Sequence, residues 1–170
     1  MIELIVLDVD GTLTDGKIIY SSSDDEIKDF QETKAFDVKD GLAIASWTKK
    51  LNKKVAIITG RDSQLVKKRA KDLNITHLYQ GVDNKDEILE TILKDENLTW
   101  ENVASIGDDL NDYKMLAKSG LSFCVNDAVF DIKELVDVVC KNNGGSGAVR
   151  EMIEYILKKD NKKDLKSLWV

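Results

Sequence analysis

The stretch Ile2-Glu3-Leu4-Ile5-Val6-Leu7-Asp8-Val9-Asp10-Gly11-Thr12-Leu13-Thr14 decides the fold. Its apolar first half has the length and β-branched content of a strand that is buried on both faces, as in a parallel sheet. The run ends in two carboxylates one residue apart, Asp8 and Asp10, and Gly11 then allows the chain to turn. Open α/β sheets bind their ligands at the carboxyl ends of such strands. We therefore place a functional site at the end of this strand.

Two neighbouring carboxylates at a buried position need a positive charge beside them. Like charges disfavour each other's ionisation, so keeping both ionised without a cation is costly. A hard divalent metal ion with oxygen ligands removes this cost, and Mg²⁺ is the usual choice where phosphate is also present. A strand followed by an ordinary Asp-Gly turn is the simpler alternative for this stretch taken alone.

Composition narrows the class of protein. The chain has 170 residues, of which 42% are hydrophobic and 33% charged, as in a soluble globular domain. We expect residues 1–157 to form one domain with a hairpin at about 17–38, and residues 158–170 to form a C-terminal tail. The net charge of −6 argues against nucleic acid as a partner, and no apolar run is long enough to span a bilayer. Cys124 and Cys140 are predicted to be buried thiols in a reducing compartment, so we expect a cytoplasmic protein.

Strand-like apolar runs alternate with amphipathic helical segments along the chain. This alternation predicts a doubly wound, parallel, Rossmann-like α/β sheet. The expected strands are 2–7, 54–59, 77–80, 103–106, 121–125 and an edge strand at 136–139. Six helices are expected. They start at Leu42, after a cap at Asp62 or Ser63, and near Asn84, and they include 113–116, 128–135 and 149–157. In the second of them, Leu65, Val66, Ala70 and Leu73 are expected to point inward. Residues 17–20 and 26–30 flank a Ser/Asp-rich turn, which is typical of a β-hairpin.

Polar groups fall at the carboxyl ends of several predicted strands or at the helix starts beside them. They are Asp8 and Asp10, Thr59, Lys85, and Asp108 with Asp109 and Asp112. Together they offer a nucleophile, an acid/base, a hydroxyl donor, a cation and metal ligands, which are the groups that phosphoryl transfer requires. A cation in the first turn of a helix is unfavourable by about 0.3–1 kcal/mol, so Lys85 is expected to face an anion. Helix capping would explain one of the three acids after residue 107, but not all of them.

These motifs resemble those of the haloacid dehalogenase superfamily of phosphatases. The matching residues are Asp8-Val-Asp10-Gly-Thr12, Thr59, Lys85 and Gly107-Asp108-Asp109-Leu-Asn-Asp112. The resemblance implies that Asp8 attacks phosphorus to form a phosphoaspartyl intermediate and that Asp10 is the acid/base. It also implies that Mg²⁺ is held by the Asp8 and Asp108 carboxylates and the Asp10 main-chain carbonyl. Thr59 and Lys85 complete the implied catalytic set and bind the phosphate. Asp109 and Asp112 are implied to hold the metal ligands in place without contacting the metal themselves.

Within the superfamily the closer resemblance is to the 3-deoxy-D-manno-octulosonate 8-phosphate (KDO 8-phosphate) phosphatases. It rests on Ala35–Gly41, Ala56–Arg61, Tyr79–Gly81 and Gly147–Glu151 besides the motifs above, and it extends from residue 1 to about residue 157. The resemblance implies a Mg²⁺-dependent phosphatase of a small anionic sugar phosphate, without a large cap domain. It further implies a homotetramer with shared active sites and no membrane partner.

The same resemblance makes Gly60, Arg61 and Arg69 candidates for binding the sugar acid, with Arg69 contributed by a neighbouring subunit. Solvated surface charge is the simpler alternative for both arginines. Ser146 stands in Gly144–Gly147 where relatives often carry a larger or charged residue, which leaves open the 9-phosphate of a nine-carbon acid such as N-acetylneuraminate. The loop itself either binds phosphate through its amides or is a plain helix entry.

Three further alternatives stay open at this stage. The extra residues Gln31–Thr33 form a bulge or lengthen the second arm of the hairpin. The tail residues Leu165, Leu168 and Trp169 enter a neighbour's site or are disordered. A non-catalytic domain that partners a sugar nucleotidyltransferase is another alternative, which the retained pair Asp8 and Asp10 disfavours. A phosphomutase is the last alternative, which the missing cap domain disfavours.

Overall fold

The computed structural model describes residues 1–22, 30–161 and 164–170. Within them, six parallel strands form one sheet in the order β5-β4-β1-β6-β7-β8. The strands are β1 (Leu4–Leu7), β4 (Lys54–Ile58), β5 (His77–Tyr79), β6 (Val103–Gly107), β7 (Leu121–Cys124) and β8 (Val138–Val139). Because β1 lies between β4 and β6, the residues that follow β1 lie between the ends of two neighbouring strands. The predicted doubly wound α/β sheet is confirmed, and β8 is the predicted edge strand.

Helices connect successive strands of the sheet, and a last helix follows β8. They are α1 (Val38–Ala45), α2 (Gln64–Asp72), α3 (Lys85–Glu96), α4 (Tyr113–Lys118), α5 (Phe130–Leu135) and α6 (Ala148–Asn161). Shorter turns are the π-helix η1 (Ser46–Lys50), which continues α1, and the 3₁₀ helices η2 (Trp100–Asn102), η3 (Leu110–Asp112) and η4 (Lys166–Leu168). No helix in the described part of the chain is long and apolar enough to cross a membrane.

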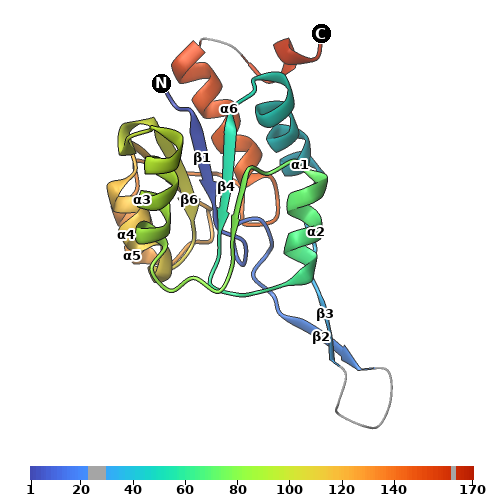
Figure 1. Ribbon diagram of the computed structural model, residues 1–170. Helices are drawn as coiled ribbons and strands as arrows, with labels where there is room; N and C mark the ends of the chain where they lie inside the picture. The colour runs from blue at the N-terminus through green and yellow to red at the C-terminus, as the bar shows by residue number, and fades with distance from the viewer. Residues whose placement is uncertain (23–29, 162–163) are drawn as a thin grey trace.

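The side chains of β1 build two separate cores. Ile5 and Leu7 pack with α1, α2 and α6 on one face of the sheet, whereas Leu4 and Val6 pack with α3 and Met115 of α4 on the other (Figure 1). Successive side chains of a strand point to opposite faces, so a continuous apolar run serves both cores. All four side chains are fully buried, as the sequence predicted. Both cysteines are buried and free, which confirms their prediction as buried thiols.

The hairpin projects from the edge of the molecule at which β1 and β4 end (Figure 1). It consists of β2 (Ile19–Ser22) paired with β3 (Phe30–Thr33) in antiparallel register. The first arm therefore begins two residues later than predicted, and the predicted segment 26–29 lies outside the described residues. Gln31–Thr33 are part of β3, so the extra residues lengthen the second arm.

Several element boundaries differ from the sequence prediction. The first helix begins at Val38, not Leu42, because the Asp37 carboxylate caps it by accepting a hydrogen bond from the Lys39 amide at 2.7 Å. Leu65 was predicted to point inward but is 39% exposed, whereas Val66 and Ala70 are buried. Residues four apart share one face of a helix, so the buried stripe of α2 excludes position 65. The fifth helix begins at Phe130, two residues later than predicted.

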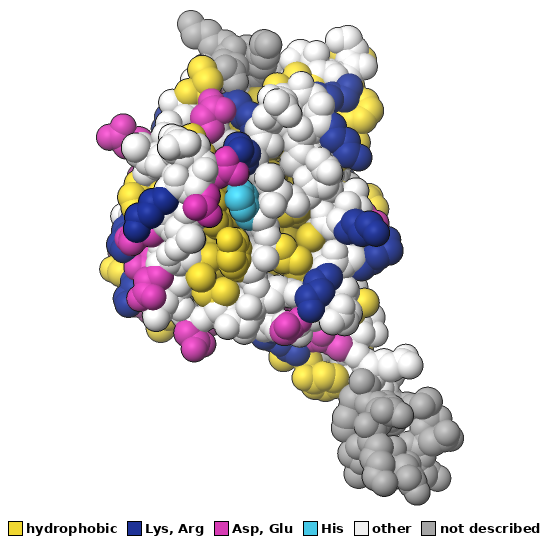
Figure 2. Space-filling view, in the orientation of Figure 1, with side chains coloured by type: hydrophobic (Ala, Val, Ile, Leu, Met, Phe, Trp, Pro, Cys, Tyr) yellow, Lys and Arg dark blue, Asp and Glu magenta, His cyan; other side chains and the backbone are white. Residues whose placement is uncertain are grey.

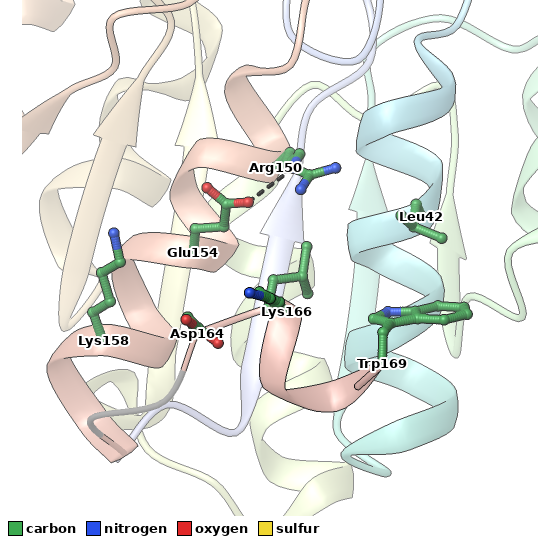
Figure 3. A pocket seen from close by; sticks show the side chains of 8 residues that line it. Leu42, Arg150, Glu154, Lys158, Asp164, Lys166 and Trp169 are labelled. Carbon is green, nitrogen blue, oxygen red and sulfur yellow. Dashed lines mark hydrogen bonds and ion pairs between the residues drawn. The ribbon is translucent and has the colours of Figure 1, made fainter.

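Residues 164–170 of the tail pack on their own chain. The Trp169 indole donates a hydrogen bond to Ser46 Oγ at 3.0 Å, and the Lys50 ammonium lies 3.9 Å from the centre of the same ring. Leu165 is 3% exposed. A cavity of about 450 Å³ lies between this segment, α1 and α6, with Leu42 and Glu154 among its walls (Figure 3). Of the two alternatives left open for the tail, disorder does not hold for these residues, and their contacts lie within their own chain.

Candidate active site

A buried lysine joins two carboxylates at the carboxyl end of the sheet. Asp8 follows β1, Lys85 opens α3, and Asp112 closes η3. Lys85 Nζ donates hydrogen bonds to Asp8 Oδ1 at 2.5 Å and to Asp112 Oδ1 at 2.6 Å. The three residues are at most 3% exposed. The anion that the sequence predicted in front of Lys85 is thus present as two side chains of the same chain.

Asp108 lies beside this group at the end of β6. Its amide donates a hydrogen bond to Asp112 Oδ2 at 3.0 Å, and Thr12 Oγ1 donates to Asp108 Oδ1 at 3.4 Å. Gly11 has a φ of +94°, and a Cβ at this position would collide with the Asp108 carboxylate. A side chain at residue 11 is therefore excluded both by the backbone conformation and by the approach of Asp108.

Burial and mutual repulsion disfavour ionisation of these acids. Burial raises the pKa of Asp8 well above its usual value, with a further increase from Asp112 that Lys85 offsets in part. Burial, and then Asp112, raise the pKa of Asp108 to about 6. Burial alone would lower the pKa of Lys85, but Asp8 and Asp112 outweigh it and raise that pKa. The ammonium therefore stays charged, and one positive charge faces three carboxylates.

The arrangement fits a divalent metal ion. Carboxylate oxygens of Asp8, Asp108 and Asp112 all lie within 4.8 Å of one another. Hard cations such as Mg²⁺ take oxygen ligands, and a bound cation would favour the ionised carboxylates that burial and mutual repulsion disfavour. Both oxygens of Asp112 already accept hydrogen bonds, from Lys85 and from the Asp108 amide. Asp8 and Asp108 are consequently the better placed carboxylate ligands.

Thr59 directly follows β4, the strand beside β1. Its amide donates to the Tyr79 carbonyl at 3.0 Å, and its carbonyl accepts from the Val82 amide at 3.1 Å, so its backbone is held on both sides. Its side chain is buried, and its hydroxyl has no hydrogen-bond partner among the described residues. The adjacent Gly60 is exposed. Thr59 therefore has a hydroxyl available for a ligand at the end of the strand beside β1.

Asp109 and Asp112 have different surroundings. Asp109 is exposed and caps η3, because its Oδ1 accepts a hydrogen bond from the Leu110 amide at 2.7 Å. Asp112 is fully buried and holds Lys85 and the Asp108 backbone. The capping role that sequence reasoning allowed for one of the acids thus belongs to Asp109.

Asp10 makes a contact that sequence reasoning missed. Its Oδ1 forms an ion pair with the ammonium of Lys34, the residue directly after β3, whose side chain is only 2% exposed. The structure thus separates the two acids of the first motif, since Asp8 pairs with Lys85 and Asp10 with Lys34. The sequence offers one signal for Lys34, which is the alternation of Glu32 and Lys34 along one face of a strand.

The two candidate arginines contact residues outside the carboxylate cluster. Arg61 Nη2 donates to Glu32 Oε1 at 2.7 Å, which ties the end of β4 to the hairpin. Arg69 Nη2 donates to the Asp37 carbonyl at 3.2 Å, and its guanidinium lies 5.4 Å from the centre of the Phe36 ring. Arg69 is therefore anchored at the start of α1 in its own chain.

The glycine-rich loop supports the turn that follows Asp8 and Asp10. The Gly145 amide donates to the Thr12 carbonyl at 3.0 Å, and a Cβ at Gly144 would collide with the Gly11 carbonyl. The loop thus packs its backbone directly against residues 11–14. Of the two sequence interpretations, the structure places this loop against protein backbone as the entry to α6.

Comparison with known proteins identifies the family. A haloacid dehalogenase-like hydrolase model matches residues 76–153. The KDO 8-phosphate phosphatase of Escherichia coli is 43% identical over 164 residues, which is 96% of this chain and 83% of that protein. The chain belongs to the KDO 8-phosphate phosphatase family of haloacid dehalogenase-like hydrolases. Its Haemophilus influenzae relative is 37% identical over 95% of this chain and 86% of its own length.

Solved structures of this family share the fold. The Moraxella catarrhalis KDO 8-phosphate phosphatase, in complex with magnesium, phosphate and KDO, superposes with a TM-score of 0.87 at 41% identity, covering 95% of this chain and 88% of that one. The cobalt-bound Haemophilus influenzae enzyme gives a TM-score of 0.84 at 37% identity, covering 95% and 90%. The resemblance found in the sequence motifs is therefore confirmed.

Proposed function

We propose that this chain is a Mg²⁺-dependent phosphatase that hydrolyses KDO 8-phosphate to KDO and phosphate. The observation that carries the proposal is the buried group Asp8, Lys85 and Asp112 beside Asp108, in a chain 43% identical to such phosphatases over 96% of its length. Mg²⁺ would be held by the Asp8 and Asp108 carboxylates and the Asp10 main-chain carbonyl. When bound, it neutralises phosphate charge that would otherwise repel the nucleophile.

The proposed reaction has two displacement steps at phosphorus. A carboxylate oxygen of Asp8 attacks, the bond from phosphorus to the sugar oxygen breaks, and Asp10 gives its proton to the departing alkoxide. Asp10, now ionised, takes a proton from water, and the resulting hydroxide attacks the aspartyl phosphate. Inorganic phosphate leaves and Asp8 is restored as a carboxylate.

The remaining residues of the site bind the phosphate and orient the acids. Lys85 neutralises charge and orients Asp8, and the unpaired Thr59 hydroxyl donates to a phosphate oxygen. Asp112 holds Lys85 and the Asp108 backbone, which fixes both relative to each other. Asp109 supports this arrangement as the cap of η3.

Sugar recognition is proposed for Gly60 and Arg61, and for Arg69 across a subunit contact in a homotetramer. Arg61 is 36% exposed beside the hairpin, so a carboxylate or hydroxyl can reach it. Arg69 is anchored through the Asp37 carbonyl at the start of α1, and its contribution to a neighbour's site rests on the family resemblance. Apolar side chains gather at the base of the hairpin, where Ile18 and Ile19 are 52% and 50% exposed, and Figure 2 shows hydrophobic surface there. Such a patch is suited to association between subunits.

Two further features of the proposal lie outside the site. The free cysteines accord with a reducing, cytoplasmic location. The division of the chain into a domain at 1–157 and a tail at 158–170 stays a prediction. Light scattering tests the tetramer, and a monomer at working concentrations would exclude shared active sites.

Steady-state kinetics with the phosphates of two sugar acids test the proposed substrate. We expect kcat/KM to be higher for KDO 8-phosphate than for N-acetylneuraminate 9-phosphate, with release of inorganic phosphate that a phosphomutase would not produce. The Asp8→Asn variant is the control for contaminating phosphatase and should lose more than about 10³-fold in kcat while keeping its circular dichroism spectrum. Preference for the nine-carbon ester would overturn the substrate, and full turnover by Asp8→Asn would overturn the mechanism.

A further inference from the structure

Lys34 is a buried cation that the proposed reaction has not yet used. It follows β3 at the base of the hairpin, and its side chain is 2% exposed. Its ammonium pairs with Asp10 Oδ1 and lies 3.3 Å from Glu32 Oε1. A buried ammonium is costly unless it is paired, so both carboxylates are needed to hold it in place.

Glu32 extends this contact toward the proposed sugar site. Its Oε1 also accepts a hydrogen bond from Arg61 Nη2 at 2.7 Å. Glu32 and Lys34 are two residues apart in an extended segment, so their side chains leave the same face of the hairpin arm. A continuous series of ion pairs therefore runs from Asp10, through Lys34 and Glu32, to Arg61 at the end of β4.

The contact with Lys34 distinguishes the two oxygens of Asp10. Oδ1 is held by the ammonium, whereas Oδ2 has no hydrogen-bond partner among the described residues. An acid that protonates a leaving group must present one oxygen in a defined direction, because a misplacement of about 1 Å can cost about 10²-fold in rate. Holding Oδ1 leaves Oδ2 as the oxygen that can exchange a proton with a ligand.

We propose that Lys34 is a positioning residue for Asp10, holding Oδ1 so that Oδ2 delivers the proton to the leaving oxygen, and that Glu32 couples this position to Arg61. The inference rests on the proposed function and deepens it. It assigns the hairpin a role within the active site of its own chain. Lys34 acts through Asp10 and touches no reacting atom.

Two aryl phosphates of similar shape test this role. Phenyl phosphate releases a basic phenolate that needs a proton, whereas p-nitrophenolate leaves readily without one. The Lys34→Met variant should therefore lose about 10-fold or more in kcat/KM on phenyl phosphate but less than about threefold on p-nitrophenyl phosphate. Neither ester carries a sugar, so a change at Arg61 does not enter the comparison. The Lys34→Arg variant, which keeps the cation, should recover part of the loss on phenyl phosphate.

Lys53→Met is the matched control. Lys53 is also mostly buried and pairs with Glu3 at 3.2 Å, but it lies just before β4, at the opposite ends of the strands. Its removal should change neither ester's kcat/KM. If Lys34→Met does not fold, Glu32→Gln, which weakens the support of Lys34, should shift the ratio of the two kcat/KM values in the same direction by about twofold or more.

Equal losses on the two esters would overturn the inference, since they would indicate a structural role or a direct phosphate contact. A rise in KM alone, with kcat unchanged on both, would do the same. Should the wild-type chain hydrolyse neither aryl phosphate nor KDO 8-phosphate, the proposed function itself would fail. Activity in the wild type with an unchanged ratio in the variants would remove only the role of Lys34.

Discussion

The two ends of the sheet carry ion pairs of opposite character. Beyond the carboxyl ends of the strands, Lys85 is 1% exposed and faces Asp8 and Asp112. Before the amino ends, Lys53 pairs with Glu3, whose side chain is 40% exposed. Water can therefore solvate the Glu3 carboxylate, whereas it cannot reach the group around Lys85. Buried groups with an excess of one charge often bind a ligand, so the difference is consistent with a functional site at the carboxyl end of the sheet.

Removal of the buried lysine should give the largest effect on stability. In Lys85→Met, Asp8 and Asp112 lose their counter-charge, and the free energy of unfolding at neutral pH should fall by about 3–5 kcal/mol. Urea unfolding measures this change. Lys53→Met is the matched control at the other end of the sheet and should cost about 1 kcal/mol or less. Similar losses in the two variants would remove the contrast between the ends.

Asp40 is a buried carboxylate outside the proposed site, so it shows the effect of burial on an acid that has no proposed function. Asp40, in the first turn of α1, accepts a hydrogen bond from the Arg150 amide at 2.8 Å, and its buried Oδ2 has no hydrogen-bond partner within residues 1–22, 30–161 and 164–170. Burial raises the pKa of Asp40 to about 6, and the nearby Asp37 adds to this, whereas Lys39 opposes it.

Because the folded pKa of Asp40 lies above its unfolded value, the charged form destabilises the fold. Wild-type stability should carry this penalty above pH 6 and lose it below pH 4. The Asp40→Asn variant lacks the titration. Its free energy of unfolding relative to wild type should therefore rise by about 2–3 kcal/mol between pH 4 and pH 6, measured by urea unfolding at each pH. A difference that does not change across this interval would show that Asp40 keeps an ordinary environment.

Addition of Mg²⁺ should give the smallest of the three effects. An ion that binds only the folded state stabilises it by about 1–3 kcal/mol at concentrations roughly 10 to 100 times its dissociation constant. The midpoint of thermal unfolding should therefore rise with Mg²⁺ in the wild type and return on addition of a chelator. Asp108→Asn should reduce this rise, and the amino-end variant Lys53→Met should keep it. An equal rise in all three proteins would place the ion elsewhere.

The sequence identified those parts of the site that lie directly at strand ends. Asp8, Lys85 and Asp108 each follow or open a strongly patterned element, so the order of the sheet brings them together. Lys34 and Glu32 were missed because their place depends on how the hairpin folds back over the strand ends, which no local pattern specifies.

Helix packing set a second limit on prediction from sequence. Asp40-Gly41 reads locally as a turn before a helix, yet both residues lie within α1. A Cβ at Gly41 would come within 2.5 Å of Arg69 Nη2, so the glycine accommodates a side chain from another helix. The position of Arg69 depends on the same packing of α2 against α1, and its sequence neighbours, all charged or small, carry no sign of it.

The contact between Gly144–Gly145 and the turn after Asp10 limits how far this protein can be shortened. The loop that touches this turn is the entry to α6, so the last helix and the first strand share one piece of backbone packing. A version of the chain that stops before residue 144 would retain every proposed catalytic side chain and lose the support behind them. The smallest active unit of this enzyme is thus set by its scaffold at the C-terminal end, well beyond the last residue that takes part in the proposed chemistry.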